Sequence, residues 1–237
     1  SGQPPAPDEW SDHDFFVVTV PGAQEPLRAD PGWLPDADRV VLWHRETPHG
    51  VKAIWDDGHL AELAVFDDQE LGVARVNRFR VLLDRGGVAA RMAQVRVATV
   101  ALARREAPDE RWLAGQLLGA LLVGAGRFAR GERASGRHLV HDVATGHLLA
   151  LAARVVPVAP GAVGDDLDPF RRLEQTRPAV ARALEAALDG PVPDGALGLL
   201  DLAEEHLAPR LDAWPALAAR VVRARIAAAR GPAATPS

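Results

Sequence analysis

The chain has no cysteine and no tyrosine, and it has one methionine and one lysine among its 237 residues. Without cysteine there is no disulfide framework, thiolate metal site or cysteine nucleophile, which excludes zinc fingers and thiol enzymes. The sequence also lacks the phosphate-binding loop of P-loop NTPases and the Gly-x-Ser-x-Gly turn of α/β-hydrolases. We find no apolar run approaching the roughly 20 residues that span a bilayer, so we expect a soluble globular protein.

The chain also has fewer basic than acidic residues. Twenty-seven basic residues stand against 32 acidic ones, a formal net charge of −5, which does not favour a nucleic-acid or membrane binder. Residues 1–100 hold 16 acidic and 10 basic side chains, so the acidic surplus lies in the first part of the chain. All basic residues except Lys52 are arginine, which indicates a compositional bias rather than phosphate recognition. The polar, proline-rich start carries no signal segment, so we expect a cytoplasmic protein with residues missing before Ser1.

The hydrophobic period changes near residue 87. Before it, short β-branched and aromatic runs predict strands, and Asp56-Asp57-Gly58 predicts a hairpin turn. The expected strands cover residues 15–20, 40–44, 51–55 and 59–66, with a short edge strand at 81–83. After it, Ala, Leu and Arg dominate segments with helical spacing. The expected helices cover residues 88–105, 109–131, 135–155, 169–188, 196–207 and 214–229.

This pattern predicts an α+β protein with two domains. A mixed β-sheet domain is expected at 1–87, followed by an α-helical bundle at 88–230 and a flexible tail at 231–237.

Asp12 and Asp14 stand two residues apart where the first strand begins. In an extended backbone both carboxylates project to one face, an arrangement that suits Mg²⁺, which prefers oxygen ligands. A solvated acidic turn gives the same short pattern.

A third acid, Glu62, interrupts an apolar strand. Alternation places it on the face of Leu60 and Ala64, where a carboxylate needs a cation or a donor. Alternatively, Ala61 and Leu63 belong to the buried face and Glu62 points to solvent. If the strand of Asp12 and Asp14 is adjacent, the three acids can converge on one metal ion.

The order of these elements resembles a known family. Ser1-Gly2, a short loop, Asp12-His13-Asp14 opening a strand, the hairpin at 50–58 and Glu62 in the strand 61–66 follow the pattern of one domain. Residues 1–87 resemble the nucleotidyltransferase domain of the polymerase-β-like superfamily, most closely bacterial enzymes that adenylylate lincosamide and aminoglycoside antibiotics. The helical part resembles them only loosely.

The resemblance implies a Mg²⁺-dependent transfer of AMP from ATP to a hydroxyl of a small molecule, with antibiotic resistance as one outcome. Asp12, Asp14 and Glu62 would be the catalytic acids and metal ligands, with Glu62 either binding metal or accepting the proton of the attacking hydroxyl. Ser1 would contact phosphate. A non-catalytic nucleotide-binding relative and adenylylation of a protein partner are the alternatives.

Three features depart from the family pattern. The glycine expected before Ser1 is not in the chain, nor are the helix and strand that normally precede it. The loop at residues 3–9 lacks the basic residue often found there, and a glutamate stands at 62 where much of the superfamily has aspartate.

Between two expected helices, residues 127–137 hold four arginines. They either reach the nucleotide phosphates or form a solvated helix end, and a similar Arg-Gly-Glu segment in related enzymes favours Arg130 as a nucleotide contact. His138, His141, Asp142 and His147 follow, without the His-Glu-x-x-His spacing of a zinc site. We expect His141 or Asp142 in a substrate pocket and at least two of the four on the helix surface.

Overall fold

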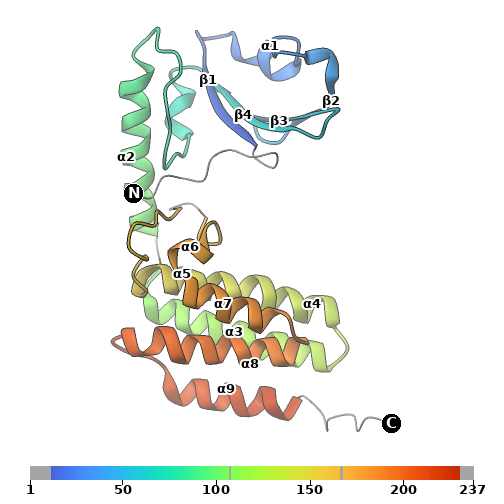
Figure 1. Ribbon diagram of the computed structural model, residues 1–237, viewed down its shortest axis with the longest axis vertical. Helices are drawn as coiled ribbons and strands as arrows, with labels where there is room; N and C mark the ends of the chain where they lie inside the picture. Colours follow the sequence, from blue (N-terminus) through green and yellow to red (C-terminus); the bar gives the residue numbers. More distant parts are fainter. Residues whose placement is uncertain (1–11, 107, 166–167, 230–237) are drawn as a thin grey trace. The chain divides into compact units, whose positions relative to one another are not determined.

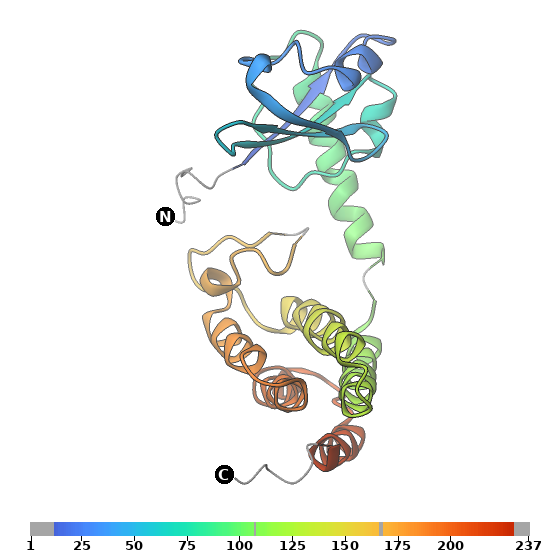
Figure 2. The ribbon, with the colours of Figure 1, turned by 90° about the vertical axis from the view of Figure 1, so that its right-hand side faces the viewer.

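The computed structural model describes residues 12–106, 108–165 and 168–229 and divides the chain into two compact units between Arg105 and Glu106 (Figures 1 and 2). The first, here called the sheet unit, contains all the described strands, and the second, the helical unit, contains only helices and loops. The expected α+β architecture, a mixed sheet followed by helices, is confirmed.

The sheet unit is built on four strands in the order β1-β4-β3-β2. β1 pairs in parallel with β4, whereas β4 with β3 and β3 with β2 are antiparallel. The strands are β1 (His13–Val18), β2 (Val40–Arg45), β3 (Gly50–Trp55) and β4 (Leu60–Phe66). The predicted hairpin is present, and Gly58 at its turn has a positive φ of 85° that glycine adopts without strain.

The edge strand expected at 81–83 is wrong. That segment pairs with no strand within the described residues, and its Leu82 and Leu83 are 77% and 66% exposed. A run of three apolar residues is too short to form a strand without a sheet edge to pair with.

Each face of the sheet carries a cluster of buried apolar side chains. On one face Ala61, Leu63 and Val65 pack near α1 (Gln24–Ala29), together with half-buried Trp33 and Trp43. Toward the end of β4 the other face carries a second apolar cluster, which includes Phe66 and packs against η2 (Glu70–Val73) and α2 (Val88–Glu106). A short 3₁₀ turn, η1 (Ala37–Arg39), leads into β2.

Helix α2 explains why the unit boundary falls at 105 rather than near 87. Met92 and Val95 of α2 are buried against Phe66, Leu71 and the loop after η2. The change of hydrophobic period at 87 therefore marks a change of secondary structure, and the division of the core comes one helix later.

The helical unit packs around α3 (Glu110–Ala129), which contacts α4, η3, α5, α8 and α9. Its other segments are α4 (Arg133–Arg137), the π-helical η3 (His138–Ala144), α5 (Thr145–Val155), α6 (Leu173–Thr176), α7 (Pro178–Leu188), α8 (Val192–Leu202), the π-helical η4 (Ala203–Leu207), the short η5 (Ala208–Arg210) and α9 (Ala216–Ala229). The tail expected at 231–237 lies outside the described residues.

The helix expected at 169–188 is divided in two. Arg177 has an extended φ of −142°, and Pro178 starts α7 at a position where its missing N–H costs nothing. Proline disfavours helical geometry in the residue before it, which explains the break between α6 and α7.

One helix in the described part of the chain, α3, is long and apolar enough to cross a bilayer. This corrects the sequence-based view that no segment approaches that length. Length and composition alone do not separate a span from the core helix of a globular unit, and Leu113, Leu117 and Leu121 of α3 are buried among the other helices.

Candidate metal centre

Asp12 and Asp14 lie where β1 begins. Asp12 directly precedes the strand, Asp14 is its second residue, and both are exposed. Between them, His13 belongs to the opposite face, where its ring lies 4.5 Å from that of His59. The alternation of β1 thus directs the two carboxylates to one face while the intervening ring packs on the other.

The parallel pairing of β1 with β4 brings the third acid to the same place. Asp14 is directly opposite Glu62 in the register of the two strands. One carboxylate oxygen from each of Asp12, Asp14 and Glu62 lies within 4.8 Å of the others. The convergence expected from the sequence is therefore present.

The donor set fits a magnesium ion. All three donors are carboxylate oxygens, the ligand type that Mg²⁺ prefers, and the three side chains are exposed or half-exposed, so waters can complete the shell. Octahedral Mg²⁺ places its ligand oxygens about 3–4 Å apart. The three donor oxygens lie within 4.8 Å of one another, so small side-chain rotations would bring them into that range.

The burial of β4 answers the question left open for Glu62. Ala61, Leu63 and Val65 form the deeply buried face, with exposures of 2%, 3% and 0%. Glu62 lies on the other face with its side chain 38% exposed. It is not simply solvated, however, because the neighbouring strand supplies a partner.

That partner is Lys52, which the sequence analysis did not assign to the site. Lys52 lies opposite Glu62 in the β3–β4 register, and its Nζ is 2.6 Å from Glu62 Oε1 and 3.0 Å from Glu46 Oε1. The hydrogen bond to Glu62, followed by that to Glu46, raises the pKa of Lys52 above its usual range. The signal was available, since this is the one lysine of the chain and the hairpin turn sets its register with Glu62.

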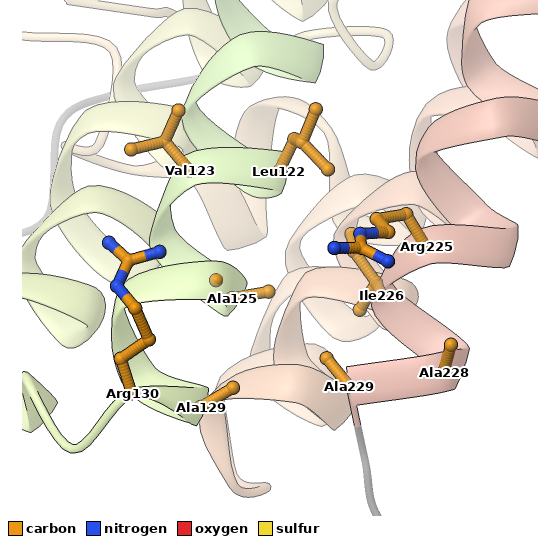
Figure 3. A pocket seen from close by; sticks show the side chains of 10 residues that line it. Leu122, Val123, Ala125, Ala129, Arg130, Arg225, Ile226, Ala228 and Ala229 are labelled. Atoms are coloured by element: carbon orange, nitrogen blue, oxygen red, sulfur yellow. The ribbon is translucent and has the colours of Figure 1, made fainter.

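Two other predicted residues are not among the described residues of the sheet unit. Ser1 lies outside the described residues. Arg130 follows α3 in the helical unit. Its side chain is 65% exposed, and its Nε lies 3.1 Å from Glu132 Oε1. Its guanidinium borders an open groove of about 770 Å³ between α3 and α9, lined mainly by apolar side chains with Arg225 on the opposite wall (Figure 3). The contact of Arg130 with nucleotide stays a prediction.

The histidine segment is mostly structural. His138 and Asp142 form an exposed pair at 2.9 Å, which confirms that at least two of these residues lie on the helix surface. His147 packs edge-on against Trp112, and burial lowers its pKa. His141 points its Nε2 toward Gly195 of α8, and that buried atom has no hydrogen-bond partner among the described residues.

No protein-family model matches this chain, and a search of curated proteins gives no match either.

Proposed function

We propose that the protein is a Mg²⁺-dependent nucleotidyltransferase that moves AMP from ATP to a hydroxyl of a small molecule. One observation carries this proposal: Asp12, Asp14 and Glu62, from two adjacent parallel strands, place one carboxylate oxygen each within 4.8 Å of the others. The order of these acids along the chain, within a mixed sheet followed by helices, is the order that the nucleotidyltransferase resemblance requires.

Each acid has a distinct task in this proposal. Asp12 and Asp14, both exposed, would hold the ion, which supplies charge neutralisation for the nucleotide phosphates. Glu62 would complete the ligand set or accept the proton of the attacking hydroxyl. In the transfer the acceptor oxygen bonds to the α-phosphorus, the bond from that phosphorus to the bridging oxygen breaks, and pyrophosphate leaves.

The acceptor is proposed by class. The helical unit would supply its pocket, and the acidic surplus of residues 1–100 suits a cationic molecule such as an aminoglycoside over an anionic one. A lincosamide, the other acceptor class suggested by the resemblance, would rely less on this charge. The proposed setting is the cytoplasm, where ATP and Mg²⁺ are both available.

The test is thermal unfolding with Mg²⁺ and a non-hydrolysable ATP analogue. At a hundredfold excess over its dissociation constant the ligand should stabilise the wild type by about 2.7 kcal/mol, or roughly 5–10 °C for a chain of this size. Asp12→Asn with Asp14→Asn should abolish the Mg²⁺-dependent part of the shift.

The matched control is Asp56→Asn with Asp57→Asn, which removes two exposed acids at the hairpin turn of the same sheet. It should keep the full shift. An equal shift in the Asp12/Asp14 variant, or no shift in the wild type, would contradict the proposal.

The ion pair of Lys52 with Glu62 favours a second candidate function. In this alternative the protein is a non-catalytic relative of the nucleotidyltransferases, which binds nucleotide without transferring AMP. A resident ammonium 2.6 Å from Oε1 of the third acid leaves two carboxylates for the ion. Turnover of labelled ATP onto any hydroxyl acceptor separates the candidates, because only the enzyme releases pyrophosphate.

A further inference from the structure

Lys52 lies between two acids that belong to different parts of the sheet. Glu62 is on β4, while Glu46 directly follows β2, where its N–H donates to the carbonyl of Gly50 across the β2–β3 turn. The ammonium contacts both carboxylates, at 2.6 and 3.0 Å, and all three side chains are one-third to one-half exposed. A small rotation of the lysine side chain can therefore favour either partner.

The type of residue matters for this movement. A lysine ammonium is a point charge with three rotatable donors on a flexible stem, whereas an arginine fork binds a carboxylate in one planar geometry. The chain uses arginine at every other basic position, so the residue between Glu46 and Glu62 is an exception to its own composition.

The charges give this movement a consequence. While the ammonium is on Glu62, a divalent cation at the carboxylate triad meets a like charge at one of its three ligands. If the ammonium moves to Glu46, Glu62 regains its full negative charge toward the ion, and Lys52 keeps a carboxylate partner.

We propose that Lys52 is a positioning residue that exchanges its ion pair between Glu62 and Glu46, releasing Glu62 when a divalent cation enters the site. The inference rests on the proposed function, since it takes the Asp12, Asp14 and Glu62 triad as the cation site. It adds that Lys52 is the counter-ion of Glu62 before the cation enters, and that Glu46 receives the ammonium afterwards.

The test uses Mn²⁺ alone, without nucleotide, and follows free Mn²⁺ by electron paramagnetic resonance. Lys52→Met should tighten Mn²⁺ binding by roughly fivefold, because it removes the positive charge next to the ligand Glu62. Glu46→Gln should weaken it by a similar factor, because the ammonium loses its second partner and stays on Glu62. Lys52→Arg, which keeps the charge, should not show the tightening.

The double variant Lys52→Met/Glu46→Gln distinguishes exchange from simple electrostatics. If Glu46 acts through the ammonium, Glu46→Gln should have no effect once Lys52 is gone, so the two changes will be strongly non-additive. An additive result would overturn the inference, because Glu46 would then act only as a nearby charge. Thermal unfolding of each variant, without metal, checks that it is folded like the wild type.

The baseline is Asp12→Asn/Asp14→Asn. If the wild type binds Mn²⁺ and this variant does not, the cation site stands, and the Lys52 and Glu46 variants alone decide the exchange. If the wild type and the baseline variant bind Mn²⁺ equally, or neither binds it, the cation site and the exchange both fail.

Discussion

Arg28 of α1 and Glu70 of η2 form an ion pair next to the end of β4, in which the arginine side chain is 3% exposed and the glutamate 27%. The same guanidinium donates from Nε to the carbonyl of Val65, at 3.0 Å, and Nη1 contacts Glu25. One buried cation therefore joins α1, the end of β4 and the segment that leads to α2.

Arg28→Met should destabilise the protein by about 2–4 kcal/mol. The change leaves the buried carbonyl of Val65 without this donor and Glu70 without its cation, and losing one partner of a buried pair costs more than an exposed pair ever contributes. Urea denaturation measures the loss. Arg39→Met, which removes an exposed pair with Asp56 and Asp57, is the control and should change little.

The same network predicts sensitivity to acid. The hydrogen bond from Arg45, and then that from Arg28, lowers the pKa of Glu25 to about 2, and Arg28 holds the pKa of Glu70 below its usual value. Carboxyls with a lowered folded-state pKa stabilise fully above their unfolded pKa near 4.5, and this contribution is lost as pH falls toward 2.

We expect the unfolding midpoint, measured at a series of pH values between 6 and 2.5, to decrease once the pH is below about 4.5. The decrease should be smaller in Glu25→Gln/Glu70→Gln. A variant whose midpoint falls as steeply as that of the wild type would show that other carboxyls control the acid limb.

A close approach of two glycines predicts a localised sensitivity in the helical unit. A Cβ on Gly136 would lie 2.8 Å from the carbonyl oxygen of Gly124 and 2.9 Å from the backbone nitrogen of Phe128. Gly136→Ala should therefore cost about 2–3 kcal/mol, since backbone on α3 must move.

Gly119→Ala is the matched control. Gly119 is exposed on α3, and nothing lies within 4 Å of a Cβ added there. The alanine should therefore stabilise the protein by about 0.5–1 kcal/mol. Thermal unfolding of the two variants should give shifts of opposite sign, and two shifts of the same sign would contradict this packing.

The start of α3 depends on one cap. Asp109 accepts a hydrogen bond from the backbone N–H of Trp112 at 2.6 Å. Asp109→Ala should cost about 1 kcal/mol in chemical denaturation, and Asp109→Ser should restore most of it because a hydroxyl can accept the same bond. Equal losses in both variants would show that the cap does not support the helix.

Local chemistry explains what the sequence could predict of the fold. The β-branched runs, the Asp57-Gly58 turn and the long Ala/Leu segments correctly indicated four strands and most helices, because each signal lies within one element. The unit boundary was not predictable in the same way, since it depends on where Met92 and Val95 pack and not on where the helix begins.

The candidate site was likewise predictable from local patterns only in part. Alternation placed Asp12 and Asp14 on one face, and their meeting with Glu62 could be stated only on the condition that the two strands are neighbours. The pairing of β1 with β4 is a long-range choice that no local pattern encodes. The Lys52–Glu62 pair, by contrast, follows from hairpin register and was within reach of the sequence.

The parallel pairing of Asp14 with Glu62 also has a kinetic consequence. The hairpin of β3 and β4 closes over a few residues, but β1 can join it only after a loop of more than forty residues has closed, which is a slower step. Neither strand holds all three carboxylates, so the proposed cation site should form during refolding only when β1 pairs with β4. Binding at the proposed site would therefore report the completion of the sheet, later than any signal from the β3–β4 hairpin.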